Sequence, residues 1–292
     1  MNPLRQQVIE DMTVRNLAPT TQATYVHQIS MFARHFDCSP EKLGPKEIRS
    51  YQVYLTKEKQ LAPSSIALAV AALRFLYNVT LQKHWALEEV IPMPKMPATL
   101  PVVLSPEEVL QFLESIEHIQ HRTILTTCYA AGLRISEAVH LKPVDIDSPR
   151  MMIRVEQGKG AKDRYVMLSP RLLETLRVWW RTKRPAHWLF PGRWESEPIT
   201  RHAVEKACKQ AHERSGIHKP ISPHSFRHAF AVHMLENGTD VRVIQLLMGH
   251  RSLSTTANYL RIATTRVCSA TSPLDLLPRP VDAKSFVPPQ QS

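Results

Sequence analysis

The first 90 residues carry apolar side chains at the three- and four-residue spacing of an amphipathic α-helix. This spacing recurs in four successive stretches, and the clearest of them contains Ile66, Val70, Leu73 and Tyr77. The two-residue alternation that is typical of a strand does not occur in this region. The pattern therefore predicts that residues 1–90 fold as a small bundle of four short helices.

Residues 91–104 interrupt the helical pattern with four prolines. Because proline lacks a backbone donor and blocks helix formation, we expect an extended linker over this segment. A strong helix start follows at residues 105–108, Ser-Pro-Glu-Glu. Ser105 suits the N-cap and Glu108 can complete a capping box, so a second domain is predicted over residues 105–262.

The helical pattern then returns and is interrupted at recognisable points. A helix over about 121–141 is expected to break or bend near Gly132, and residues 170–262 are again mostly helical in pattern. Residues 263–292 hold five prolines and little periodicity. We expect this last segment to be a mobile tail with one apolar patch, Leu274–Leu277.

Two short stretches of the second domain have the character of strands. They are residues 151–155 and 164–168, on either side of a glycine-containing turn at 158–163 that carries Lys159 and Lys162. Such a pair predicts a β-hairpin. The predicted fold class is therefore mainly α with a small antiparallel β-sheet, divided between a helical domain and a mixed domain.

The charge of the chain narrows the choice of partner. Lys and Arg number 37 against 26 Asp and Glu, which gives a formal net charge of +11. Residues 1–90 hold ten basic and eight acidic side chains, so 27 basic and 18 acidic ones lie beyond residue 90. This excess favours a polyanion, either nucleic acid or an acidic membrane surface. If DNA is the partner, the second domain is expected to hold the stronger phosphate-contacting surface.

The cysteines and the hydropathy predict a cytoplasmic protein. The four cysteines, Cys38, Cys128, Cys208 and Cys268, are far apart in the sequence and are interpreted as free thiols of a reducing compartment. No apolar run approaches the roughly 18 residues that a membrane-spanning helix needs. The first residues, MNPLRQQVIEDM, lack the apolar centre of a signal peptide.

Six polar side chains of the second domain suit phosphoryl transfer without a metal or cofactor. They are Arg134, Lys159, His224, Arg227, His250 and Tyr259. Two arginines match the non-bridging oxygens of a phosphodiester, a histidine can move a proton, and a lysine can protonate a departing alkoxide. A tyrosine hydroxyl, whose ordinary pKa is about 10, needs a neutralised phosphate and a nearby base to act as a nucleophile.

The order and spacing of this set resemble the tyrosine recombinase (phage integrase) family, in particular its Xer-type and mobile-element site-specific recombinases. GLRISE contains Arg134, and it is followed by GKGAKDR, by HSFRH and by Gly249-His250. His250 lies 23 residues after Arg227, and Tyr259 lies nine residues after His250. The resemblance covers roughly residues 8–262.

The resemblance implies a role for each of the six residues. Arg134 and Arg227 would clamp the scissile phosphate, with support from His250. Lys159 would be the general acid on the leaving 5′ oxygen, and His224 would be the base near the nucleophile. Tyr259 would form a 3′-phosphotyrosine, which the 5′ hydroxyl of a partner strand then attacks.

The resemblance also implies an architecture and partners. Residues 1–90 would be a SAM-like core-binding domain and residues 105–262 the catalytic domain, which together clamp double-stranded DNA. A homotetramer would bring two DNA sites together. Each cleavage is matched by a ligation, so no ATP or other cofactor is required. In similar recombinases the segment after the nucleophile docks on a neighbouring subunit, which is the role expected for residues 263–292.

Four further residues are candidates for contact with DNA: Arg201, His202, Lys162 and Arg164. Arg201 and His202 begin a helix whose equivalent in similar recombinases enters the major groove. The alternative for this helix is an ordinary solvated basic face. Lys162 shares its turn with Lys159 and is the rival candidate for the general acid.

Two neighbours of the set have other interpretations. His224 and His228 lie four residues apart, which is also a zinc-ligand spacing, but no third ligand is evident and we expect no metal. His228 is expected to pack or bond within its own helix. Glu137 is expected to orient an arginine or to accept hydrogen bonds from backbone donors.

Two other functions share parts of this pattern. A type IB topoisomerase uses the same chemistry to relax one duplex without exchanging strands, but the helical first domain and the Xer-like spacing favour a recombinase. A non-catalytic DNA-binding regulator would keep the fold and lose the chemistry, and the intact set of six residues argues against it.

Overall fold

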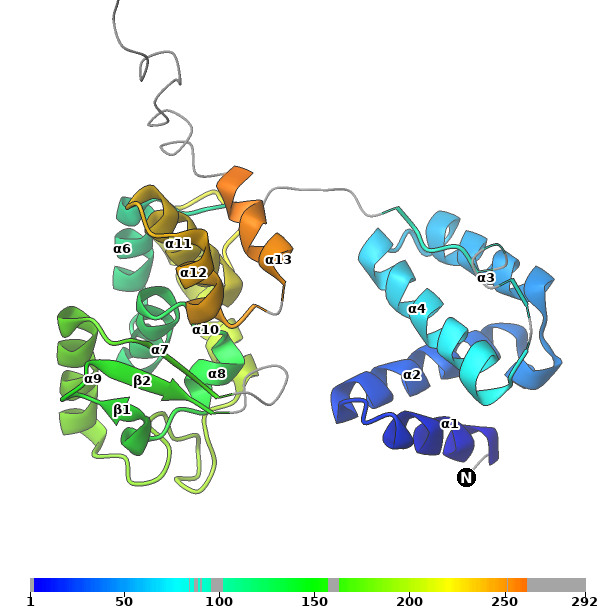
Figure 1. The fold of residues 1–292 in the computed structure, drawn as a ribbon, viewed down its shortest axis with the longest axis horizontal. Coiled ribbons are helices and arrows are strands. Elements are labelled where there is room, and N and C mark those ends of the chain that lie inside the picture. The colour runs from blue at the N-terminus through cyan, green and yellow to red at the C-terminus, as the bar shows by residue number, and fades with distance from the viewer. Residues whose placement is uncertain are drawn as a thin grey trace, which may run out of the picture. The chain divides into compact units, whose positions relative to one another are not determined.

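A computed structural model describes residues 3–83, 85–86, 89, 91–95, 102–156, 163–250 and 252–261. The chain divides into two compact units, Met1–Thr99 and Leu100–Ser292, and the division falls inside the proline-rich segment (Figure 1). The predicted fold class, mainly α with a small antiparallel sheet, is confirmed. The tail predicted at 263–292 lies outside the described residues.

Proline begins four α-helices of the first unit. The helices are α1 (Pro3–Val14), α2 (Pro19–Phe36), α3 (Pro45–Lys57) and α4 (Pro63–Phe75), with short helical turns at Pro40–Lys42 and Leu76–Thr80. Proline suits a first helical position because its φ is already helical and the N–H it lacks would be unpaired there. The apolar stripes of the helices meet in one core around Phe32, Ile48 and Tyr77.

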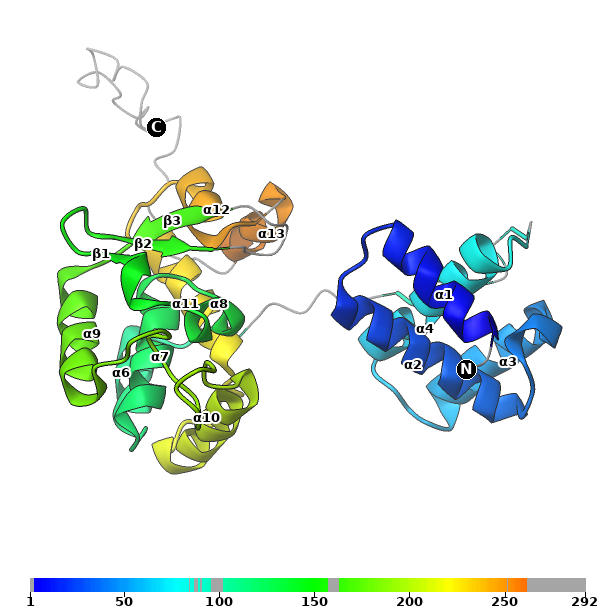
Figure 2. The same cartoon turned by 90° about the horizontal axis from the view of Figure 1, so that it is seen from below.

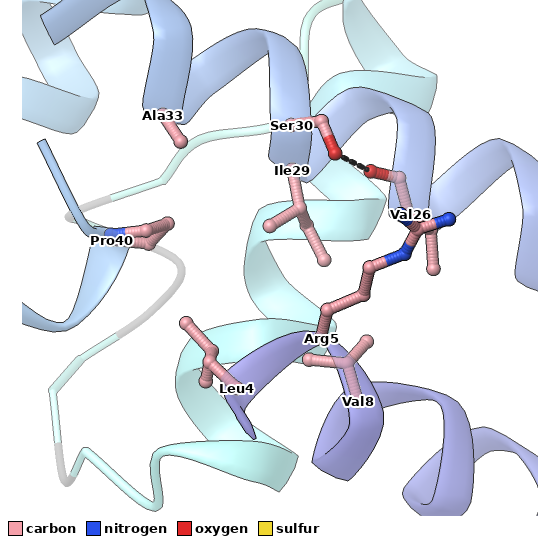
Figure 3. A pocket seen from close by; sticks show the side chains of 8 residues that line it. All are labelled: Leu4, Arg5, Val8, Val26, Ile29, Ser30, Ala33 and Pro40. Atoms are coloured by element: carbon pink, nitrogen blue, oxygen red, sulfur yellow. Dashed lines mark hydrogen bonds between the residues drawn. The ribbon is translucent and has the colours of Figure 1, made fainter. Parts of the chain in front are cut away.

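An open pocket lies between α1 and α2 of the first unit. Most of its lining is apolar, and the Ser30 hydroxyl donates to the carbonyl oxygen of Val26 at 2.8 Å (Figure 3). Arg5 is the charged residue of the lining. All six predicted catalytic residues belong to the other unit.

The second unit is built around α7, which contacts both α9 and α11 (Figure 2). Its helices are α6 (Pro106–Glu114), α7 (Ile119–Ala130), α8 (Ile135–Val139), α9 (Pro170–Lys183), α10 (Arg201–Ser215), α11 (Pro223–Glu236), α12 (Val241–Met248), α13 (Leu253–Ala257) and the 3-10 turns η3 (Pro143–Asp145) and η4 (Asn258–Arg261). The capping box predicted at Ser105 is present, since Ser105 and Glu108 each bond to the other's backbone N–H. Across the described ranges, no helix is long and apolar enough to cross a membrane.

The sheet consists of three short antiparallel strands in the order β1 (Ile146–Asp147), β2 (Met152–Val155) and β3 (Arg164–Met167). Ile153 pairs with Val166, and both side chains are buried. The two predicted strands are confirmed as β2 and β3. β1 was missed, because two residues are too few for an alternating pattern to appear. Residues 157–162, most of the predicted turn, lie outside the described residues.

The helix expected over 121–141 is divided completely at Gly132. This residue has φ +63°, a conformation that glycine adopts without the strain a side chain would bring. A Cβ at this position would lie 2.5 Å from the ring of Phe230, so α11 packs directly on the break. α8 begins afresh at Ile135, with Arg134 as its N-cap. The break thereby places Arg134 at the start of a helix instead of inside one.

Candidate active site

A buried arginine joins three segments at the centre of the second unit. Arg227 lies in α11, is 3% exposed, and donates to the carbonyl oxygens of Gly132 and Met248. It therefore connects α11 to the break after α7 and to the end of α12. Burial and the charge of Arg134 lower the pKa of Arg227 to about 10, so its guanidinium is cationic at neutral pH.

Glu137 is the acidic partner of three arginines. Its carboxylate accepts a hydrogen bond from Arg134 at 2.7 Å and two from Arg164 at 2.9 and 2.8 Å. Nη1 of Arg227 lies 3.8 Å from the same carboxylate, which also accepts the backbone N–H of Arg134 at 2.8 Å. Glu137 thus orients arginines and accepts a backbone donor, as expected. Three cations around one carboxylate leave the cluster net positive, which suits an anion.

We expect Glu137→Gln to destabilise the second unit strongly at neutral pH. Burial raises the pKa of Glu137, but the hydrogen bonds and charge of Arg164, together with those of Arg134, outweigh it and lower the pKa to about 2. Relative to an ordinary value of 4.5, this shift corresponds to ~3 kcal/mol. Because the folded-state pKa is depressed, this stability is present above pH 4.5 and is lost as the pH falls through about 2.

Urea unfolding, followed by tryptophan fluorescence at several pH values, measures this difference in the free energy of unfolding. The wild type and Glu137→Gln should differ most at pH 7 and converge as the medium is acidified. Glu205→Gln is the matched control, because its exposed pair with Arg201 at 2.7 Å is worth about 1 kcal/mol or less. Similar, pH-independent losses in both variants would contradict the role given to Glu137.

Arg164, a candidate for contact with DNA, is engaged within the protein. Its three guanidinium nitrogens all bond within the protein: Nη1 and Nη2 donate to Glu137, and Nε donates to the carbonyl oxygen of Leu247 at 2.9 Å. A Cβ on Gly249, whose φ is +62°, would lie 3.1 Å from Cδ and Nε of Arg164. Arg164 therefore anchors β3 against the end of α12 and holds Glu137 in place.

Tyr259 lies in η4 with its ring in the core and its hydroxyl against a histidine. The residue is 5% exposed and belongs to an apolar cluster with Ile244 and Met248. Its hydroxyl oxygen lies 2.8 Å from Nδ1 of His228. The His250 ring is nearly parallel to the tyrosine ring, with centroids 6.4 Å apart. Burial raises the pKa of Tyr259, and the charges of nearby arginines offset part of that rise.

The histidine on the Tyr259 hydroxyl is not the one that the resemblance implies. His224 was expected beside the nucleophile, and His228 was expected to pack or bond within its helix. In the structure, the hydroxyl of Tyr259 forms its hydrogen bond with His228. His224 is exposed one turn earlier on α11, and its ring centroid lies 6.2 Å from that of His228. Tyr259 is 31 residues from His228, so no local pattern in the sequence could reveal this contact.

His250 is held beside the cluster by a buried hydroxyl. It follows Gly249, the left-handed C-cap of α12, and its Nδ1 lies 2.8 Å from Oγ1 of Thr256, which is fully buried. Burial and the charges of the nearby arginines lower the pKa of His250 to about 4, so the imidazole is neutral at pH 7. When Nδ1 accepts from Thr256, Nε2 carries the proton and can donate to an anion.

Comparison with known proteins identifies the family of this chain. Residues 102–266 match the phage integrase family, and residues 4–87 match the N-terminal SAM-like domain of phage integrases. The chain belongs to the phage integrase family. It is a tyrosine-type site-specific recombinase, as its sequence predicts. The family match includes all six predicted catalytic residues.

This recombinase has close relatives and a common fold. The Sinorhizobium fredii protein y4qK is 62% identical over 280 residues, which cover 96% of this chain and 91% of the relative. The tyrosine recombinase XerD of Staphylococcus aureus is 30% identical over 259 residues, covering 76% of this chain and 87% of XerD. The structure of a lambda integrase fragment, a dimer bound to a core site, has a TM-score of 0.74 at 18% identity and covers 87% of this chain and 96% of that one. The last likeness supports the fold alone.

Two further predicted residues of this recombinase lie at the surface of the second unit. Arg201 and His202 are exposed in the first turn of α10, after the N-cap Thr200. Lys159 and Lys162 lie outside the described residues. No group of three or more His, Cys, Asp or Glu in the described part of the chain is placed to hold a metal ion.

Proposed function

We propose that this recombinase breaks and rejoins double-stranded DNA through a 3′-phosphotyrosine on Tyr259. The observation that carries the proposal is the setting of the Tyr259 hydroxyl, which bonds to His228 and lies within the electrostatic field of Arg227 and Arg134. A nucleophile, a proton acceptor and cations for a phosphate therefore occupy one site.

In this proposal the scissile phosphate binds at the net positive arginine cluster. Arg134 and Arg227 bond to its non-bridging oxygens, and Nε2 of His250 adds a neutral donor. His224, exposed on the first turn of α11 and within the electrostatic field of Arg227 and Arg134, is the further proposed contact of this anion. These contacts stabilise the charge that develops on the equatorial oxygens as the phosphoryl group is transferred.

Bond making and bond breaking balance without a cofactor. The Tyr259 oxygen bonds to phosphorus and gives up its proton, while the bond from phosphorus to the 5′ oxygen breaks. Lys159, our proposed general acid, protonates that oxygen. In rejoining, a 5′ hydroxyl attacks phosphorus and gives its proton back to Lys159, while the tyrosine oxygen leaves and recovers a proton.

Covalent capture tests this proposal directly. Duplexes made from the DNA that flanks the gene, and from a pool with randomised sites, are nicked beside the cleavage position so that the short 5′ strand diffuses away after cleavage. We expect the protein to remain attached to the 3′ end, and peptide mapping should place the link on Tyr259. A mapped link on another residue, or no adduct from any duplex, would contradict the proposal.

Strand exchange separates a recombinase from a topoisomerase. We propose that a homotetramer brings two DNA sites together, whereas relaxation of one duplex needs a single protomer. Two differently labelled duplexes should yield joint products, and supercoiled plasmid without a site should stay supercoiled. Efficient relaxation without joint products would favour the topoisomerase alternative.

We expect binding to fall steeply with salt. Cationic side chains displace condensed counterions from DNA, so the logarithm of the binding constant should decrease linearly with the logarithm of salt concentration. The net charge of +11 and the exposed Arg201 on α10 motivate this expectation. A gel-shift series between roughly 50 and 200 mM salt measures the slope, and a flat line would argue against a DNA clamp.

A further inference from the structure

The Tyr259 hydroxyl meets one imidazole nitrogen at hydrogen-bonding distance, and that nitrogen belongs to His228. The distance to Nδ1 is 2.8 Å, and the two ring centroids are 5.7 Å apart. This bond links α11 to η4, two elements that pack against one another. The ring of His224 also lies near that of His228, with centroids 6.2 Å apart and an angle of 29° between the rings.

We propose that His228, and not His224, accepts the Tyr259 proton when the hydroxyl attacks phosphorus. The inference rests on the proposed function, because it assigns a step of that same reaction. The proton moves from the tyrosine oxygen to Nδ1 of His228 as the bond from oxygen to phosphorus forms. In rejoining, the same proton returns to the departing tyrosine oxygen. His228 touches a reacting atom in both steps and is therefore a catalytic residue.

The surroundings keep His228 unprotonated at neutral pH. Burial, the neighbouring His224 and the charge of Arg227 lower the pKa of His228 to about 4, so its imidazole is neutral at pH 7. A neutral imidazole with its proton on Nε2 has a lone pair on Nδ1, which is the nitrogen that faces the hydroxyl. A phosphodiester bound at the arginines adds negative charge, which offsets the field of Arg227 and stabilises the imidazolium formed during attack.

The same helix contains a matched histidine–tyrosine pair away from the site. Nδ1 of His233 lies 2.9 Å from the hydroxyl of Tyr129, and Nε2 lies 3.0 Å from the carbonyl oxygen of Leu104. This pair connects α11 to α7 and to the segment before α6. A variant of His233 therefore loses the same kind of bond from the same helix without touching Tyr259.

The experiment compares His228→Asn, His228→Ala and His233→Asn in the full chain. Asparagine retains an acceptor near the position of Nδ1 but is not a base. Single-turnover cleavage of the nicked duplex should slow roughly 10²- to 10⁴-fold in both His228 variants, the usual contribution of a general base. His233→Asn should cleave at the wild-type rate. Melting temperature and half-site binding show whether each variant is folded.

Added imidazole gives a readout that a merely structural role would not change. It should restore part of the cleavage rate of His228→Ala, and substituted imidazoles should restore it in the order of their basicity. Wild-type cleavage by His228→Asn would overturn the proposal, because a hydrogen bond alone would then suffice. Folded, DNA-binding His228→Ala that imidazole does not accelerate would also overturn it.

The proposed function and this inference fail in distinguishable ways. If the wild type forms no adduct on Tyr259, the proposed function is wrong. If the wild type forms that adduct and the His228 variants form it equally fast, the reaction stands and the assignment of the proton acceptor is wrong.

Discussion

Tyr259→Phe is expected to abolish covalent capture of nicked DNA while half-site binding stays at the wild-type level. The substitution removes only the hydroxyl, which is the proposed nucleophile. The ring remains in the apolar cluster with Ile244 and Met248. The loss of the bond to His228 should lower the free energy of unfolding by about 1–3 kcal/mol, the usual cost of one lost hydrogen-bond partner.

The measurement is denaturing electrophoresis of the protein after incubation with a labelled nicked duplex. Tyr129→Phe is the matched control, because it removes a partly buried tyrosine hydroxyl that bonds to His233 on the same helix. This control should still form the adduct. If Tyr259→Phe formed the adduct at wild-type yield, the assignment of Tyr259 as the nucleophile would be wrong.

Lys159→Ala should slow cleavage far more than Lys162→Ala. The departing 5′ oxygen needs a proton, and a general acid contributes roughly 10²- to 10⁴-fold to the rate. Both lysines belong to the segment predicted as one short turn, so the pair of variants controls for a general loss of positive charge in that segment. The measurement is single-turnover cleavage of the nicked duplex by each variant.

A substrate with sulfur in place of the leaving 5′ oxygen separates proton donation from positioning. A thiolate leaves without being protonated, so this substrate should restore cleavage by Lys159→Ala to near the wild-type rate. Failure of the sulfur substrate to restore the rate would indicate that Lys159 positions the phosphate instead.

Much of the fold followed from patterns between near neighbours. The capping box at Ser105, the break at Gly132 and the strands β2 and β3 each depend on a few consecutive residues. Helical spacing likewise compares positions only three or four residues apart. The division near the prolines of 91–104 is of the same kind, since proline acts on its own backbone.

The family could also be predicted from the sequence, because its signature is a set of separated motifs in a fixed order. The roles of the individual side chains depend on contacts across the fold. Arg164 was a candidate for DNA contact, yet its guanidinium is occupied by Glu137 and Leu247. The strand β1 needed its partner β2 to form at all.

The sequence by itself determined the fold class, mainly helical with a small antiparallel sheet, and the family. Only the tertiary structure decided that the Tyr259 hydroxyl hydrogen-bonds to His228 and that Glu137 forms ion pairs with three arginines. The physical reason is the distance along the chain over which each interaction acts. Local backbone preferences act between adjacent turns, whereas a hydrogen bond between α11 and η4 joins residues 31 positions apart and forms only after the chain between them has packed.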